Sequence, residues 1–319
     1  MTDLDRRTTM VALAGTLAAT SAIATPVAKT VPPRGERHLP AQTRWSLPPP
    51  LKPAHEVLAR LPDTSLYYQD TGGAGEVVVL LHAYTGSYAV WGYQQSAFAA
   101  AGYRVLTYSA RNHYKSAAMD PKAPGTSTGD LRALLNHLDI RRAHIVGTAG
   151  GALAALDYAL SHPDRTISVT LASSHMGISD PSFLAIGARM FPRGVYGISH
   201  SFSEVGPSYR AGYPEGLAEW QRLDEIAWQG GDLRQEPEKP LTFARMEAEL
   251  RVPTLLITGD ADLMMPPSRM RAVAPHMPGA ELVFVAEAGH SLHWEQPEAF
   301  NGAVLDFLRR HRDRAQPHV

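Results

Sequence analysis

A turn of small residues between a strand and a helix is the first feature of this sequence that could carry chemistry. An apolar run over 143–147 leads into a turn centred on Ala149, and a helical pattern follows over 152–160. Gly147 and Gly151 let the strand and the helix approach closely, which pushes the middle residue out at a strained turn, as in the Gly-x-Ser-x-Gly nucleophile elbow. A serine there would attack a carbonyl carbon, but the methyl group of Ala149 cannot.

At this motif the sequence resembles the α/β-hydrolase superfamily, in particular its capped members, which include meta-cleavage-product hydrolases, haloperoxidase-like esterases and lactonases. The resemblance covers about 65–308. It implies a catalytic acid at Asp262, with Asp260 as the alternative, and a catalytic histidine at His290. The order nucleophile, acid, histidine is that of the superfamily.

The resemblance also implies an oxyanion hole. Its donors would be the backbone N–H groups of Tyr84 and Gly150, aimed where negative charge develops on a carbonyl oxygen. Ala83 replaces the glycine that is usual in this loop. We expect His82, one residue earlier, to brace the loop rather than to do chemistry.

The segment 109–116 departs from the usual Asp-x-Arg-Gly-x-Gly-x-Ser of the family and keeps only its arginine and last serine. Polar side chains near the elbow are therefore candidates for the pocket. The candidate pocket residues are His82, Arg111, His113, Ser174 and Trp294. A second, overlapping set of polar residues near the elbow could replace the chemistry of the missing serine. Each of its members can be an ordinary loop residue, but we expect the replacement to come from this set. The set is His113, Lys115, Ser173, Ser174 and His175.

The elements that must position these residues alternate between short β-branched runs and helical patterns. This alternation predicts an α/β fold with a mostly parallel sheet covered by helices on both faces. The expected strands are 65–69, 76–82, 104–109, 143–147, 166–172, 254–258 and 281–285. The strand pattern stops between Ser173 and Arg251, so we expect a helical cap over 176–250, inserted into a core made of 64–175 and 251–314.

The N-terminal segment resembles a twin-arginine export signal. Arg6 and Arg7 precede a mildly apolar run that ends in a small-x-small pattern at 22–24. A membrane anchor is the weaker alternative, because the run is shorter than the roughly 20 apolar residues that span a bilayer. We expect residues 1–24 to direct export to the periplasm or the medium, and the Pro-rich 25–63 to be a linker.

Composition argues against several other classes of function. The 319 residues carry 30 Lys and Arg against 31 Asp and Glu, so the charge leaves no footprint for nucleic acid. The lack of cysteine removes thiol nucleophiles and thiolate metal ligands. His290 and His293 lack the Glu of a zincin motif, and the turn at 147–151 lacks the Lys of a phosphate loop. We therefore expect no metal, no nucleotide and no cofactor, and a small-molecule substrate as the partner.

Three explanations of Ala149 remain open. In the first, a hydrolase has had its serine replaced to trap a substrate. In the second, alanine is native and His290 with Asp262 acts as a general base on water or on an acidic substrate proton, which includes lyase and cofactor-free chemistry. In the third, the chain is a binding protein that has kept its pocket. We favour a hydrolase-type enzyme acting on a small, mostly apolar ester, lactone or C–C substrate, with lyase-type acid–base chemistry as the alternative.

Overall fold

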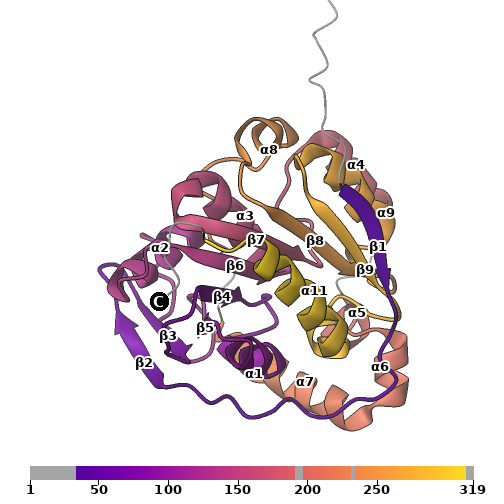
Figure 1. The fold of residues 1–319 in the computed structure, drawn as a ribbon, viewed down its shortest axis with the longest axis horizontal. Coiled ribbons are helices and arrows are strands. Elements are labelled where there is room, and N and C mark those ends of the chain that lie inside the picture. The colour runs from indigo at the N-terminus through magenta and orange to yellow at the C-terminus, as the bar shows by residue number, and fades with distance from the viewer. Residues whose placement is uncertain (1–33, 191–196, 231–233, 314–319) are drawn as a thin grey trace, which may run out of the picture.

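The computed structural model describes residues 34–190, 197–230 and 234–313 (Figure 1). The expected export signal at 1–24 lies outside these residues, as does 25–33. Within the described ranges, every helix is too short or too polar to cross a bilayer.

The core of the molecule is a nine-stranded, mostly parallel sheet. Its order from edge to edge is β1-β9-β8-β7-β6-β4-β5-β3-β2. The first seven strands in this order, from β1 across to β5, pair in parallel with their neighbours. The strand β3 pairs antiparallel with both β5 and β2. The strands are β1 (Arg34–Leu39), β2 (His55–Arg60), β3 (Ser65–Asp70), β4 (Val77–Leu81), β5 (Arg104–Tyr108), β6 (Ala143–Thr148), β7 (Thr166–Ala172), β8 (Thr254–Gly259) and β9 (Glu281–Val285).

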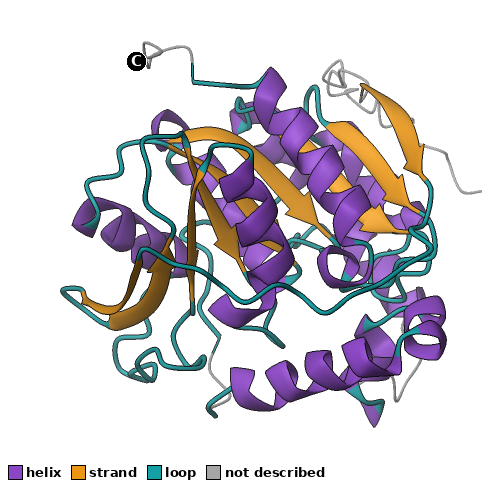
Figure 2. Cartoon of the chain, turned by 60° about the horizontal axis from the view of Figure 1, so that its bottom comes forward, coloured by secondary structure: helices purple, strands orange, loops and turns teal. Residues whose placement is uncertain are grey.

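Helices cover both faces of this sheet, and Figure 2 shows them on either side of the twisted strands. One face packs against α2 (Ser127–His137), α3 (Gly150–Ser161) and α9 (Pro267–Val273). The other packs against α1 (Gly92–Ala100), α10 (Leu292–Glu295) and α11 (Pro297–Arg310). The strands β6 to β9 are buried at every residue, as their continuous apolar runs predict. The predicted fold class is therefore confirmed.

Further helices lie between β7 and β8, where the cap was expected. They are α4 (Pro181–Met190), α5 (His200–Glu204), α6 (Pro207–Gly212), α7 (Pro214–Ala227) and α8 (Phe243–Glu249). Among the described residues, 3-10 turns lie at η1 (Tyr88–Trp91), η2 (Pro163–Arg165) and η4 (Ala274–His276). The cap divides into two parts, because α4 contacts α9 and α8 contacts η4, whereas α7 contacts α5, α6 and η1.

The expectation of a linker over 25–63 is wrong for the described part of that range. β1 pairs in parallel with β9 at one edge of the sheet, and β2 pairs with β3 at the other. Both strands escaped detection because they are edge strands: in β2 only Ala59 is buried, so no apolar alternation marks it. The connection between them also packs on the core, since the indole N–H of Trp45 donates to the carbonyl of Glu295 at 2.9 Å.

Candidate active site

The turn between β6 and α3 has the backbone of a nucleophile elbow. Ala149 has φ 49° and ψ −113°, a conformation that a residue with a side chain rarely adopts. A Cβ atom on Gly151 would lie 2.1 Å from the carbonyl oxygen of Leu81, and one on Gly147 would lie 2.3 Å from that of Gly151. The glycines therefore permit the close approach that projects residue 149 from the turn, and the residue projected is alanine.

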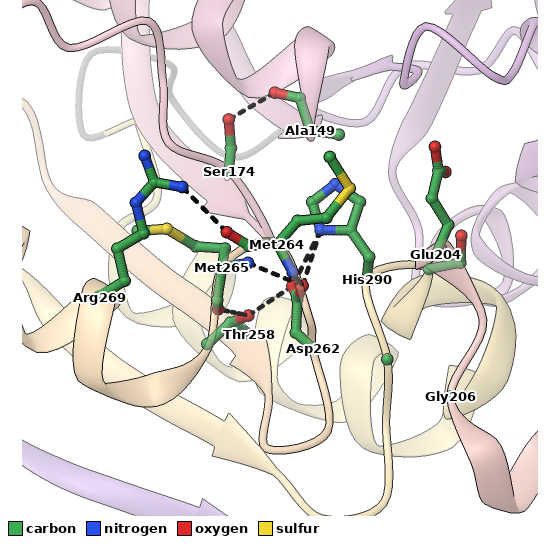
Figure 3. Close-up of polar contacts among 12 residues, drawn as sticks. Ala149, Ser174, Glu204, Gly206, Thr258, Asp262, Met264, Met265, Arg269 and His290 are labelled. Atoms are coloured by element: carbon green, nitrogen blue, oxygen red, sulfur yellow. Dashed lines mark hydrogen bonds and ion pairs between the residues drawn. The ribbon is translucent and has the colours of Figure 1, made fainter. Parts of the chain in front are cut away.

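Ser174 supports the elbow instead of replacing its hydroxyl. Its Oγ donates to the carbonyl oxygen of Ala149 at 2.6 Å and accepts from the N–H of Met176 at 2.9 Å (Figure 3). The hydroxyl proton is thus committed to the backbone of the turn. We expect Ser174 to hold the strained peptide in place and not to attack a substrate.

Asp262 and His290 meet as the sequence predicts. His290 Nδ1 lies 3.0 Å from each carboxylate oxygen of Asp262 (Figure 3). The carboxylate also accepts from the N–H groups of Met264 and Met265, both at 2.8 Å, and from the hydroxyl of Thr258 at 3.1 Å. These bonds orient the carboxylate, and through it the imidazole.

The alternative acid, Asp260, points elsewhere. Its Oδ1 accepts from the N–H of Glu287 at 2.7 Å, and its side chain is exposed. It therefore shapes the turn after β9 and makes no contact with His290. The geometry selects Asp262 as the acid.

The electrostatics of the pair favour an ionised state. Burial alone would lower the pKa of His290, but the charge and hydrogen bonds of Asp262, with smaller effects from Glu204 and Glu295, raise it to about 9. Burial likewise works against ionisation of Asp262, and the same pairing outweighs it and lowers the pKa of that carboxyl. His290 Nε2 has no hydrogen bond to any described residue, so this nitrogen is available to a ligand.

The structure also brings together the two predicted oxyanion donors. A Cβ atom on Gly150 would lie 2.8 Å from the ring of Tyr84, so the two residues are in direct contact. Gly150 is the first residue of α3, where a backbone N–H has no partner within the helix. Neither this N–H nor that of Tyr84 is bonded to another loop of the described chain. Neither N–H group is therefore committed to another group of the described residues.

Two histidines fix the oxyanion loop, which we define as residues 82–86. The N–H of Ala110 donates to His82 Nε2 at 3.0 Å, so His82 carries its proton on Nδ1 and donates to the carbonyl of Ala83 at 2.7 Å. Burial, with a contribution from the nearby His113, lowers the pKa of His82 to about 3, which keeps it neutral. His82 braces its loop, as expected.

His113, from the rebuilt segment, holds the same loop. Its Nε2 lies 3.1 Å from the carbonyl of Tyr84 and its Nδ1 lies 2.9 Å from that of Arg111. Burial lowers the pKa of His113, so the neutral ring donates to one of these carbonyls at a time. The departure from the family pattern at 113 therefore has a structural role beside the oxyanion hole.

The predicted pocket positions of Arg111 and Trp294 are wrong. Arg111 is buried in a two-bond ion pair with Asp130, at 2.8 and 2.7 Å. Trp294 is fully buried in the core, where it meets the ring of Tyr93 edge to face. Both side chains stabilise the fold, and motif position alone could not separate that role from substrate contact.

Of the polar residues expected to compensate for the missing hydroxyl, few reach the site. Lys115 is exposed and lies over the ring of Tyr67, 4.4 Å from its centroid, beside Glu56. Ser173 is buried with a positive φ of 45°, and its hydroxyl has no partner among the described residues. His175 alone of this group lines the cavity described next.

A cavity of 660 Å³ lies between the two parts of the cap. Tyr84 and Thr85 of the oxyanion loop contribute to its lining, whereas Ala149, Gly150 and His290 do not. Its apolar wall comes largely from α4 and from Ile198 and Met264. Its polar wall consists of Thr85, His175, His200, Ser203, Glu204 and Arg269. None of the candidate pocket residues His82, Arg111, His113, Ser174 and Trp294 is part of this lining.

Glu204 is the functional candidate that the sequence did not reveal. It ends the short helix α5, and its Oε2 accepts a hydrogen bond from the hydroxyl of Thr85 at 2.7 Å. Figure 3 draws Glu204 and His290 in the same region of the site, with no hydrogen bond or ion pair between their side chains. Burial raises the pKa of Glu204, and the charge of His290 opposes part of this increase. No motif marked it, because a single Glu in a polar cap segment reads as a surface residue.

Comparison with known proteins finds hydrolases among the relatives of this chain. A protein with 28% identity over 274 residues, covering 77% of this chain and 92% of its own, is 2-hydroxy-6-oxononadienedioate/2-hydroxy-6-oxononatrienedioate hydrolase 2 of Pseudomonas putida. Another, 29% identical over 263 residues and covering 74% and 88%, is the 2-hydroxy-6-oxo-6-phenylhexa-2,4-dienoate hydrolase of Burkholderia cepacia.

Solved structures show the same fold. An esterase of Thermogutta terrifontis superposes with a TM-score of 0.69 at 23% identity, covering 81% of this chain and all of its own. The enol-lactonase of Burkholderia xenovorans LB400 superposes with a TM-score of 0.62 at 26% identity, covering 79% and 100%. The model of the alpha/beta hydrolase family matches residues 78–303, which is more than half of the sequence. The chain therefore belongs to the alpha/beta hydrolase family.

Proposed function

We propose that this protein hydrolyses a small, mostly apolar ester, lactone or C–C substrate by activating water, without forming an acyl-enzyme. The observation that carries the proposal is the pair His290–Asp262, joined at 3.0 Å beside an elbow whose projecting residue is Ala149. The names of the similar proteins, which include hydrolases, an esterase and an enol-lactonase, support this range of substrates. The apolar wall of the cavity favours a substrate with little charge.

The expected mechanism uses the space where a serine hydroxyl would stand. A water molecule over the methyl group of Ala149 would lose a proton to the neutral form of His290, which the pKa of about 9 makes the minor form at pH 7. The water oxygen would bond to the substrate carbonyl carbon in the same step. The carbonyl oxygen would become negative between the N–H groups of Tyr84 and Gly150. When the intermediate collapses, the bond to the leaving group breaks and the leaving atom takes a proton.

Turnover of a panel of esters, lactones and β-diketones would test this proposal. We expect the unaltered chain to turn over at least one class, and His290→Ala to lower kcat by about 10²–10⁴-fold, the usual contribution of a general base. A fluorophosphonate should label Ala149→Ser but not the unaltered chain, because only the variant has a nucleophilic hydroxyl.

The result that would overturn the proposal is turnover by Ala149→Ser with none by the unaltered chain. The protein would then be a hydrolase disabled by its alanine. Cleavage of β-diketones without cleavage of esters or lactones would confine the proposed hydrolysis to C–C substrates. Conversion of a substrate without the addition of water would favour the acid–base alternative. Unchanged ligand binding with no turnover in either form would indicate a binding protein.

A further inference from the structure

The carboxyl group of Glu204 occupies a position from which it can exchange a proton with a bound substrate. Glu204 lines the cavity, and only 8% of the residue is exposed to solvent. One oxygen, Oε2, is held by the hydroxyl of Thr85 at 2.7 Å. The other oxygen has no hydrogen-bond partner among the described residues, yet it is not sealed in the protein. A buried carboxyl with one oxygen anchored and one facing a cavity is arranged for a ligand.

The backbone around Glu204 is tied to the histidine loop, which we define as residues 286–291. The N–H of Ser291 donates to the carbonyl of Glu204 at 2.8 Å, immediately after His290 in the chain. The indole N–H of Trp220 donates to the hydroxyl of Ser291 at 3.1 Å. This part of the cap is therefore fixed relative to the catalytic histidine.

We propose that Glu204 is a second proton-transfer residue of this site and donates a proton to the leaving group while His290 accepts one from water. The proposal rests on the hydrolytic function proposed above. It adds a role for the cap, which supplies an acid that the core of the fold lacks.

The proton balance of the cycle is complete. His290 Nε2 takes a proton from water as the new C–O bond forms, and the carboxyl group of Glu204 gives its proton to the leaving oxygen as the old C–O bond breaks. The imidazolium then returns its proton to the carboxylate of Glu204, directly or through water. The net reaction is the addition of one water across the ester or lactone bond, with no oxidant or other reactant.

Several other titratable groups surround Glu204 and His290 and affect their titration. His200 and Asp224 act on Glu204 in addition to His290. Around His290 lie Asp262, Glu295, His175 and His293. Because Glu204 and His290 interact, we expect the pair to titrate as a unit. In the reactive form Glu204 is protonated and His290 is neutral, so the two groups together hold one proton. This proton is lost as the pH passes about 9, the pKa of His290, and the population of the reactive form then falls.

The test compares two esters of the same acid that differ in their need for a proton on the leaving group. Ethyl butanoate releases a basic alkoxide, whereas p-nitrophenyl butanoate releases a stable phenolate. We expect Glu204→Gln to lower kcat/KM for the ethyl ester by at least about 10²-fold and to change that for the nitrophenyl ester only a few-fold. The amide oxygen of Gln can still accept the Thr85 hydrogen bond, so the fold should be kept.

Glu219→Gln is the matched control. Glu219 lies in α7 of the same cap, but it pairs with Arg222 on the surface and is not part of the cavity lining. This variant should leave both esters unaffected. As a second readout, kcat/KM of the unaltered chain for the ethyl ester should fall above about pH 9, and in Glu204→Gln it should rise toward that pH instead.

Each failure is distinguishable. An equal loss on both esters in Glu204→Gln, or no loss on either, would assign Glu204 a structural role and leave the hydrolytic function standing. If the unaltered chain is as inactive as His290→Ala on both esters and on the panel above, the proposed function itself fails and Glu204 loses its role with it.

Discussion

His290, the proposed general base, holds its proton more tightly than a free histidine does. Asp262 contributes most of this effect, because its carboxylate is buried and oriented by two backbone N–H groups and a threonine hydroxyl. A proton held in the folded state and released on unfolding couples stability to pH. The residue pair thus leaves a signature that can be measured without any substrate.

The free energy of unfolding should fall as the pH rises from about 6.5 to about 9. His290 has a pKa of about 9 in the fold and about 6.5 when unfolded, so its contribution is fully present below about 6.5 and lost as the pH passes 9. Asp262→Asn should remove most of this slope, which is worth roughly 3 kcal/mol for a shift of this size. Urea unfolding at a series of pH values checks this, and parallel curves for the two proteins would contradict it.

The residues predicted from the sequence are those that lie in continuous motifs. Ala149, Gly150, Asp262 and His290 each lie within five residues of the end of a predicted strand, where a short motif fixes their position. Glu204 could not be predicted, because it reaches the site through the packing of a cap helix on the oxyanion loop, 119 residues away in sequence. Motif spacing does not encode such contacts.

At the scale of elements, three segments far apart in sequence converge on the short helix α10. The carboxylate of Glu295 accepts from the N–H of Gly206 in the cap at 2.7 Å and from the N–H of Gly289 in the histidine loop at 2.9 Å. Its carbonyl accepts from Trp45, which lies in the connection between β1 and β2. Full burial raises the pKa of Glu295 to about 8. This side chain therefore joins the cap to the loop that carries His290.

Two substitutions of Glu295 should distinguish the contribution of its hydrogen bonds from that of its charge. Glu295→Ala leaves two buried N–H groups unpaired, and at about 1–3 kcal/mol each the loss of stability should be several kcal/mol. Glu295→Gln keeps an acceptor oxygen for both groups and should cost much less. Urea denaturation of the two variants gives the comparison. Equal destabilisation would show that the amides do not depend on this acceptor.

At the scale of the whole molecule, the sequence predicted the interior of the sheet and missed its edges. The seven predicted strands correspond to β3 to β9, whose apolar runs are imposed by burial on both faces. The strands β1 and β2 face solvent on one side, so hydrophobicity does not constrain them in the same way. The segment expected to be a linker instead closes both edges of the sheet.

Truncation from the N-terminus should therefore lower thermal stability once it removes β1. A chain that begins at residue 34 keeps every described element and serves as the reference. A chain that begins at residue 42 lacks β1 and exposes the edge of β9, whose residues are all buried. We expect this shorter chain to melt at a lower temperature and to aggregate, because an open, apolar strand edge recruits other strands. Thermal melts with light scattering would check this, and identical melts would refute it.

The pairing of β1 with β9 also has a consequence for synthesis. The two strands are about 240 residues apart in the chain, so at 5–20 residues per second β1 leaves the ribosome tens of seconds before its partner exists. During this interval β1 has no partner strand, while the inner strands of the sheet can already pair with one another. Completion of the sheet is therefore an event that follows translation of the last strand, and a nascent chain interrupted before that point cannot close its own edge.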